Sequence, residues 1–402
     1  MTDANETVRV ALLVVGGGPA ALSAARAYGE NGGQGPVWLV SDDDTAPYLR
    51  PPLSKEYLRG ESGEDDLPLE SDAFWSDVTL RLRTMVTTLG ADDRSAVLDD
   101  GTEIIFDHCV LATGNSPAPL PVPGADDPRV RYLRSLASAR ALREAAGDAR
   151  SAVVVGSGFI GCEAAVSLAR LGLTVTVCSR EPAPQSTRLG DDVAGRLARW
   201  LREENVVLFG ETGVTGIEDG RIAHVPGHPP IVADLVLVAA GVEPNSTLAV
   251  ATGLDMEQER VVVDEGMRSS TPTVLAAGDV AFARNAAAGR HLPVEHWGEA
   301  EAMGAIAGAT AAGATASWDS PPGFWTVIGD RVLKYAGWGD GWDDVELVGH
   351  DDGGFTAWYS SDGTIVGVAT HEADDDYERG SELVRTGASV SEVRRAEQAS
   401  QV

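Results

Sequence analysis

The chain has 402 residues, of which 43% are hydrophobic and 23% are charged, a globular composition with room for two or three domains. Its 61 acidic and 31 basic residues give a net charge of −30, which repels nucleic acid and anionic membranes. No apolar run approaches the ~20 residues that span a bilayer. We therefore expect a cytoplasmic protein with neither nucleic acid nor membrane as a partner.

A dinucleotide-binding pattern opens the chain. The apolar run Val8–Val15 leads into Gly16-Gly17-Gly18-Pro19-Ala20-Ala21 and then into an alanine-rich helical stretch. This is the order strand, tight turn, helix, in which Gly16 permits the turn and Gly18 lets backbone N–H groups approach a pyrophosphate. The positive end of the helix dipole favours the phosphates.

An acidic group follows the next predicted strand, Val37–Val40, in the sequence Ser41-Asp42-Asp43-Asp44. A carboxylate at this position accepts hydrogen bonds from an adenosine ribose, and we select Asp42 for that role. The alternative is that the three aspartates form a solvated turn, which is the expected role for two of them. The fingerprint together with its acid is a specific signal.

The same pattern occurs a second time, with the strand Ala152–Val155, the loop Gly156-Ser157-Gly158-Phe159-Ile160-Gly161 and a helix to Leu171. Its second strand, Thr174–Cys178, ends in Ser179-Arg180 rather than in an acid. Two dinucleotide sites are therefore predicted, and they differ at the ribose.

The remaining elements are strands that end in small residues and a strand-rich C-terminus. Between 115 and 124, four prolines predict an irregular crossing between domains, and a second crossing is expected after the strand 235–238. The strand 273–277 ends at Gly278-Asp279. From Pro321 onward, short alternating segments predict antiparallel strands, followed by a helix near 377–387.

Cysteine and histidine usage gives no sign of a disulfide framework or a metal site. Cys109, Cys162 and Cys178 lack the C-x-x-C spacing and are expected to be buried apolar residues. His224 and His228 are separated by helix-breaking residues, so we predict a loop and no metal ligands.

Several blocks carry a resemblance to a known family. They are Pro47-Tyr48-Leu49-Arg50-Pro51-Pro52-Leu53-Ser54-Lys55, the loop Gly158–Glu163, and Val294-Glu295-His296-Trp297. With the two fingerprints, they make the chain similar to the FAD-dependent pyridine-nucleotide oxidoreductases. The closest branch resembles the ferredoxin and rubredoxin reductases of oxygenase systems, related to apoptosis-inducing factor.

The resemblance implies an α/β fold with two nested Rossmann-like domains of the glutathione-reductase type and a C-terminal α+β interface domain with an antiparallel sheet. The expected boundaries are 1–118 and 245–320 for the FAD-binding domain, 119–244 for the NAD(P)-binding domain, and 321–402 for the interface domain.

The resemblance also implies the cofactor contacts. FAD contacts are expected from Gly16, Gly18, Pro19, Ala20, Asp42, Arg50, Lys55, Val86, Ala112, Thr113, Gly114, Asp279, Glu295, His296, Trp297 and Trp325. Nicotinamide-dinucleotide contacts are expected from Gly156, Gly158, Ile160, Gly161, Ser179, Arg180 and Gly241.

Lys55 and Glu163 are the predicted catalytic residues. By family likeness they pair beside the flavin ring and hold charge while hydride passes from NAD(P)H to FAD. A purely structural salt bridge is the alternative, and both interpretations require the two side chains to be neighbours.

Three departures from the family pattern shape the functional hypothesis. The segment 42–58 lacks the redox cysteine pair of disulfide reductases, so electrons are expected to leave to an external acceptor, and the resemblance implies that this is a ferredoxin-type iron–sulfur protein feeding an oxygenase. Ser179-Arg180 favours NADPH over NADH, although Glu181 could serve NADH if the loop is shifted. The charge of −30 requires a local basic surface for an acidic ferredoxin.

The sequence leaves two other functions open: direct reduction of a small molecule such as a quinone or a biosynthetic intermediate, and redox sensing with slow turnover. It also leaves open whether the protein is a monomer or a homodimer.

Overall fold

The computed structural model describes residues 7–391 of the chain, and residues 1–6 and 392–402 of the first and last predicted domains lie outside them. The chain forms two compact units with interleaved boundaries. The first unit runs to Leu49 and adds Pro68–Ser116 and Pro244–Gly323. The second unit comprises Arg50–Leu67, Pro117–Glu243 and the chain from Phe324 onward. Two short strands, β7 (Asn115–Pro117) and β16 (Val242–Pro244), mark the places at which the chain leaves one unit for the other.

The first unit is built on a seven-stranded sheet with the order β3-β2-β1-β6-β5-β4, in which β19 also pairs with β6. Its strands are β1 (Thr7–Val15), β2 (Val37–Val40), β3 (Val78–Arg81), β4 (Val86–Gly90), β5 (Ser95–Leu98), β6 (Glu103–Leu111) and β19 (Val274–Ala276). The pairs β3-β2, β2-β1, β1-β6 and β6-β19 are parallel, whereas β4-β5 and β5-β6 are antiparallel. Leu12, Leu13 and Val14 are fully buried, which explains the unbroken apolar run of the central strand.

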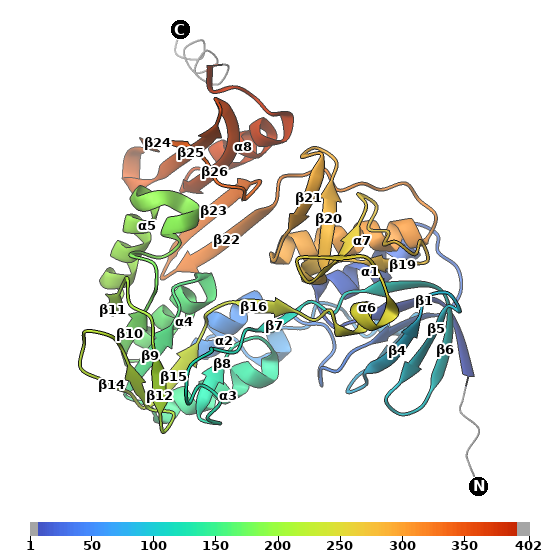
Figure 1. Cartoon of the computed structure of the whole chain (residues 1–402), viewed down its shortest axis with the longest axis horizontal. Helices are drawn as coiled ribbons and strands as arrows, with labels where there is room; N and C mark the ends of the chain where they lie inside the picture. The colour runs from blue at the N-terminus through green and yellow to red at the C-terminus, as the bar shows by residue number, and fades with distance from the viewer. Residues whose placement is uncertain (1–6, 392–402) are drawn as a thin grey trace. The chain divides into compact units, whose positions relative to one another are not determined.

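Helix α1 (Pro19–Glu30) packs directly on helix α7 (Trp297–Ala311) in the first unit (Figure 1). The packing is so close that a Cβ added to Gly304 would lie 2.2 Å from the backbone oxygen of Ala20. The same addition at Gly308 would lie 2.1 Å from the backbone oxygen of Ala24. Small residues therefore allow close backbone approach of the two helices at these two positions.

A second, four-stranded sheet completes the first unit, and sequence reasoning did not predict it. Its order is β17-β18-β20-β21, with the bounds Met256–Glu257, Arg260–Val263, Ala281–Asn285 and Arg290–Pro293. Elsewhere in the first unit, the 3-10 helix η3 (Phe74–Ser76) precedes β3, helix α6 (Thr247–Thr252) precedes β17, and the 3-10 helix η4 (Gly278–Val280) lies between β19 and β20.

The second unit contains a five-stranded parallel sheet with the order β11-β10-β9-β15-β8. Its strands are β8 (Val130–Tyr132), β9 (Ser151–Val155), β10 (Thr174–Cys178), β11 (Val206–Phe209) and β15 (Leu235–Val238). Helices α3 (Leu136–Asp148), α4 (Phe159–Arg170) and α5 (Ser186–Glu203) belong to the same unit. A small antiparallel sheet of β12 (Gly216–Glu218), β13 (Ile222–His224) and β14 (Ile231–Val232) adjoins them.

The segment 50–67 also belongs to the second unit. It forms η1 (Pro51–Ser54), α2 (Glu56–Arg59) and η2 (Glu64–Asp66), and α2 contacts α3 and α4. Its place there differs from the predicted boundary, which assigns it to the FAD-binding domain. The reason is that its contacts are with helices that begin 80 and 103 residues after the start of α2.

The C-terminal part of the second unit is an antiparallel sheet with the order β22-β23-β26-β25-β24, accompanied by helix α8 (Asp374–Thr386). The strands are β22 (Gly323–Ile328), β23 (Arg331–Gly337), β24 (Asp344–Gly349), β25 (Phe355–Ser361) and β26 (Thr364–His371), and η5 (Asp351–Gly353) joins β24 to β25. The predicted antiparallel sheet is confirmed. The prediction that 115–124 holds no regular structure is wrong at β7 only, which includes the first proline, Pro117, and pairs with β16 in a two-stranded sheet, where proline is tolerated at an edge.

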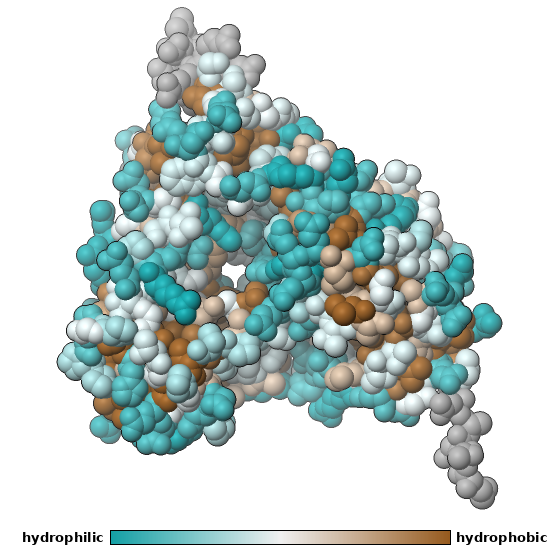
Figure 2. Space-filling model, viewed as in Figure 1, coloured by the Kyte–Doolittle hydropathy of each residue, from teal (hydrophilic) through white to brown (hydrophobic). Residues whose placement is uncertain are grey.

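None of the helices between residues 7 and 391 is both long and apolar enough to cross a membrane. Hydrophilic side chains cover much of the face drawn in Figure 2, and the apolar patches between them are small.

Candidate active site

The first glycine loop joins β1 to α1 and is closely surrounded by backbone. Gly16 has a φ of +135°, and a Cβ there would lie 2.1 Å from the backbone oxygen of Ala112. A Cβ on Gly17 would lie 2.3 Å from the Oγ atom of Ser41. Gly18 then caps α1, with Pro19 in its first turn. The loop fits a pyrophosphate, because only glycine leaves the backbone this open at a helix N-terminus.

The aspartates after β2 have different surroundings. Asp43 accepts hydrogen bonds from the Tyr48 hydroxyl at 2.9 Å and from the backbone N–H of Asp44 at 2.8 Å. The Asp44 carboxylate accepts one from Thr45 at 2.7 Å. Asp42 is exposed, and its carboxylate accepts no hydrogen bond from the described residues. Of the three, Asp42 has the carboxylate least engaged by the protein.

Several other predicted FAD residues converge at the same end of the first unit. Gly278, just before Asp279 in η4, would bring a Cβ to 3.1 Å from that of Ala20 and 3.4 Å from that of Ala300. The starts of α1 and α7 therefore meet at this turn. Glu295, His296 and Trp297 lie at the start of α7, where His296 is the N-cap and Glu295 is ion-paired with Arg260.

The strand end Ala112-Thr113-Gly114 is fixed by Asn245, which sequence reasoning missed as a site residue. The Thr113 hydroxyl donates to the Asn245 backbone oxygen at 2.7 Å, and the Asn245 side-chain amide donates to the Thr113 backbone oxygen at 3.0 Å. Val86 begins β4 in the same sheet. The signal for Asn245 was its place directly after the predicted second crossing.

The second glycine loop repeats the geometry of the first within the second unit. Gly156 has a φ of +112°, and a Cβ there would lie 2.2 Å from the backbone oxygen of Ala239. Gly161 allows α4 to approach the loop, because its Cβ would lie 2.3 Å from the backbone oxygen of Gly156. Gly158 caps α4, Ile160 in the first turn is exposed, and Gly241 follows β15 with a φ of +121°. This loop also fits a pyrophosphate.

The residues after β10 form the predicted ribose end of this second loop. The hydroxyls of Ser157 and Ser179 lie 2.6 Å apart and are buried, and the Glu181 backbone N–H donates to the Ser179 Oγ at 3.1 Å. Arg180 is exposed. The Glu181 carboxylate accepts from the backbone N–H groups of Gln185 at 3.1 Å and Thr187 at 3.0 Å, at the start of α5.

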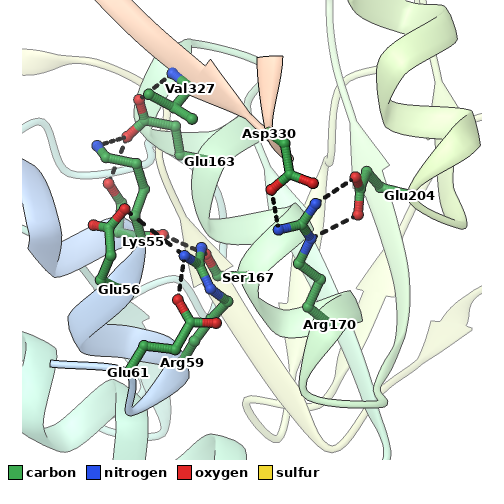
Figure 3. Close-up of polar contacts among 11 residues, drawn as sticks. Lys55, Glu56, Arg59, Glu61, Glu163, Ser167, Arg170, Glu204, Val327 and Asp330 are labelled. Carbon is green, nitrogen blue, oxygen red and sulfur yellow. Dashed lines mark hydrogen bonds and ion pairs between the residues drawn. The ribbon is translucent and has the colours of Figure 1, made fainter. Parts of the chain in front are cut away.

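Lys55 and Glu163 are neighbours in a buried cluster of the second unit. The Lys55 Nζ lies 2.8 Å from the Glu163 Oε2, and the two side chains are 9% and 7% exposed. Oε2 also accepts from the Ser54 hydroxyl at 2.5 Å. The other oxygen, Oε1, accepts from the Thr326 hydroxyl at 2.9 Å and from the Val327 backbone N–H at 3.1 Å. Figure 3 shows Lys55 and Val327 converging on Glu163.

Sequence reasoning predicted the pair and missed Ser54 and Thr326. Ser54 stands beside Lys55 in the block that carries the resemblance, so its position was a usable signal. Thr326 is 163 residues from Glu163 along the chain, and only its place after Phe324-Trp325 pointed to it. Trp325 itself is 45% exposed on β22, whereas Phe324 is buried against the ring of Phe159.

The three cysteines offer no thiol chemistry. All are buried and unbridged. Burial raises the pKa of Cys178 to about 11, and burial raises the pKa values of Cys109 and Cys162 as well. A thiolate nucleophile at neutral pH is therefore disfavoured at each position.

Two glycine loops of this geometry indicate an enzyme that binds two dinucleotides, and the segment 42–58 lacks a redox cysteine pair. Comparison with known proteins identifies the family. Residues 10–312 match the family model described as pyridine nucleotide-disulphide oxidoreductase, and residues 323–402 match the model described as reductase C-terminal. The chain belongs to the pyridine nucleotide-disulphide oxidoreductase family. It is an oxidoreductase, and the family implies FAD and a nicotinamide dinucleotide as its cofactors. The predicted family, fold and enzyme class are confirmed.

Individual relatives lie in the predicted branch. Rhodocoxin reductase of Rhodococcus erythropolis is 32% identical, over 94% of this chain and 90% of that protein. The ferredoxin–NAD(+) reductase component of the anthranilate 1,2-dioxygenase system of Burkholderia cepacia is 33% identical, over 94% of each. Among solved structures, the covalent putidaredoxin reductase–putidaredoxin complex matches with a TM-score of 0.88 at 27% identity, covering 96% of this chain and 94% of that chain.

Proposed function

We propose that the protein takes electrons from NADPH and delivers them, by way of FAD, to a ferredoxin-type iron–sulfur protein that feeds an oxygenase. When bound, the flavin accepts electrons in pairs from the nicotinamide and releases them singly. The acceptor is inferred from the relatives, whose names are rhodocoxin, rubredoxin and ferredoxin reductases. The solved putidaredoxin complex supports the same class of partner. We also propose that the protein is cytoplasmic, as expected from the sequence.

FAD is assigned to the first glycine loop, with Asp42 accepting from the ribose. This choice rests on hydrogen-bond accounting, because Asp43 and Asp44 already accept bonds from Tyr48 and Thr45. The turn at Asp279 and the start of α7 adjoin the start of α1, which supports their assignment to the same cofactor. We keep Arg50, Val86 and Trp325 as proposed FAD contacts from the family resemblance alone.

NADPH is preferred because the second loop presents hydrogen-bond donors where the sugar is expected. The Ser179 Oγ already accepts from the Glu181 backbone N–H, so when Ser157 also donates to it, its own proton remains available for a ligand oxygen. Arg180 is exposed beside it and carries a permanent charge. A 2′-phosphate can accept hydrogen bonds from both the Ser179 hydroxyl and Arg180. The proposed preference for NADPH rests on these two donors.

NADH needs an acceptor for its 2′-hydroxyl, and the carboxylate that follows Ser179-Arg180 in the sequence is engaged elsewhere. Glu181 directs one oxygen to the Gln185 N–H and the other to the Thr187 N–H. These bonds satisfy backbone donors that the first turn of a helix leaves open, so releasing Glu181 would destabilise α5. The alternative in which Glu181 serves NADH therefore carries an energetic cost.

Lys55 and Glu163 are assigned to the reacting end of the nicotinamide site. A buried ammonium beside a carboxylate holds a fixed local charge, and such charge is effective when water is excluded. The pair lies on α4 and on the segment before α2, and α4 is the helix that the second glycine loop opens. This position supports a catalytic role over a salt bridge that acts only in stability.

The anaerobic half-reaction tests the proposal. FAD-loaded protein is mixed in a stopped-flow instrument with NADPH or with NADH, and flavin absorbance is followed. We expect bleaching by both, with the higher second-order rate constant for NADPH. Cytochrome c reduction should then depend on an added ferredoxin. A flavin that neither nucleotide bleaches contradicts the enzyme, and reduction of cytochrome c at full rate without ferredoxin contradicts the acceptor.

A further inference from the structure

The Glu163 carboxylate is saturated by donors from two parts of the second unit, the segment Ser54-Lys55 and the strand β22. A carboxylate has about four acceptor positions, and here Ser54, Lys55, Thr326 and the Val327 N–H occupy one each, at 2.5 to 3.1 Å. Glu163 therefore has no position left for a ligand proton. Its role toward a bound dinucleotide has to be exerted through another residue.

Lys55 is the residue that retains donors. Its ammonium carries three N–H groups and gives one of them to Glu163, and the described residues accept no other. The side chain is 9% exposed, so the remaining N–H groups are held in a largely dry setting. The bond to Glu163 anchors the ammonium and therefore sets the direction in which its remaining N–H groups point toward a ligand oxygen or nitrogen.

The anchor depends on the strand β22 of the C-terminal sheet. Thr326 is fully buried, and its hydroxyl together with the next backbone N–H binds the Oε1 of Glu163. The turn that follows β22 also contacts α4, because Asp330 pairs with Arg170, the last residue of α4, at 2.9 Å (Figure 3). Strand β22 and the turn after it therefore contact α4 at two places, Glu163 and Arg170.

We propose that Thr326 is a positioning residue for the reaction. By donating to the Oε1 of Glu163, it fixes the carboxylate whose other oxygen orients the Lys55 ammonium toward the reacting rings. The inference rests on the proposed function, since it assumes that Lys55 meets the cofactor or the nucleotide. It makes the reductase C-terminal domain a contributor to the chemical step.

Thr326→Val is the direct test, because valine keeps the shape of threonine and removes the hydroxyl. Thr326→Ser retains the hydroxyl and is the rescue variant. Thr370→Val is the matched control, because Thr370 is 1% exposed in the same sheet and its hydroxyl lacks a partner among the described residues. Should Thr326→Val fail to fold, Ser54→Ala removes the hydroxyl donor to the other oxygen.

Two readouts are taken. The first is the rate constant of flavin reduction per bound flavin at saturating NADPH, together with the nucleotide concentration that gives half the maximal rate. The second is the NMR resonance of the lysine ε-carbon in protein with oxidised FAD bound and labelled with [ε-13C]lysine. The chain has only two lysines, so Lys334, which pairs with Asp374 at 2.7 Å, serves as the internal reference.

We expect Thr326→Val to lower the reduction rate constant about tenfold with little change in the half-saturating concentration. The Lys55 resonance should move while that of Lys334 stays, Thr326→Ser should restore both readouts, and Thr370→Val should change neither. An unchanged rate constant, an unmoved Lys55 resonance or a loss that serine does not restore overturns the inference. If neither nucleotide reduces the wild-type flavin, the proposed function fails instead, and the resonance still reports whether Thr326 orients Lys55.

Discussion

The choice between NADPH and NADH is the prediction with the sharpest kinetic consequence. Arg180→Ala removes the exposed guanidinium assigned to the 2′-phosphate and leaves the loop backbone unchanged. A hydrogen bond to a charged group contributes about 1.5 to 3 kcal/mol, and an exposed partner lies at the lower end of that range. At about 1.4 kcal/mol for each factor of ten, kcat/KM for NADPH should fall about tenfold.

Arg180→Glu replaces attraction by repulsion and should lower kcat/KM for NADPH about a hundredfold, because a like charge is added to the loss of the pair. The value for NADH should stay within about twofold in both variants, since NADH has no 2′-phosphate. The preference for NADPH should also weaken as salt is added, because the proposed contact is exposed to solvent.

The assay is steady-state reduction with each nucleotide at low and high ionic strength. Arg199→Ala is the control, because Arg199 is an exposed arginine on α5 that has no assigned role at the ribose. If the ratio of the two kcat/KM values is the same in Arg180→Glu as in the wild type, the assignment of Ser179-Arg180 to the phosphate is wrong.

Three further changes have defined outcomes. Glu181→Ala should lower the free energy of unfolding by about 1 kcal/mol in a urea titration, because two N–H groups at the start of α5 lose their acceptor, and it should not reduce kcat/KM for NADH. Gly304→Val should lower the melting temperature and the FAD content of the purified protein, since its Cβ would lie 2.2 Å from the backbone oxygen of Ala20; equal FAD content would contradict close α1–α7 packing. Burial raises the pKa of Glu299, so the folded state binds this proton more tightly than the unfolded state. The stability contributed by the proton is complete below the unfolded value of about 4.3 and is lost as pH rises through the raised folded value. The difference in unfolding free energy between wild type and Glu299→Gln should therefore fall as pH rises above about 4.3.

Local rules were sufficient to predict the two nucleotide loops. Gly16 and Gly156 need a positive φ and tolerate backbone within 2.2 Å of a would-be Cβ, and such positions are visible in sequence because only glycine fits them. The strands of the C-terminal sheet were predicted for a similar reason, since β-strand alternation and turn residues are encoded within a few residues. These elements depend little on the rest of the chain.

Interactions between distant residues could not be predicted in the same way. Ser54 and Thr326 bind one carboxylate from positions 109 and 163 residues away, and hydroxyl side chains of this kind carry no local pattern. The break in helix α5 at Gly190 also could not be predicted from the local sequence. It is compensated by the Trp342 indole and the Tyr359 hydroxyl, which donate to the backbone oxygens of Arg188 and Leu189 at 3.0 and 2.9 Å. The partners belong to the C-terminal sheet, so the break is stable only in the assembled unit.

The buried lysine explains why these distant contacts exist. In a family whose disulfide reductases place a cysteine pair before the flavin, this chain has Pro51-Pro52-Leu53-Ser54-Lys55, and a buried ammonium is costly unless an anion accompanies it. Glu163 provides that anion, and its own desolvation is then offset by hydrogen bonds to its remaining acceptor positions. One of these donors is available from Ser54, and the other two come from β22. The charge at position 55 therefore requires the start of the C-terminal domain, and loss of that strand would leave a buried ion pair with one carboxylate oxygen unsatisfied.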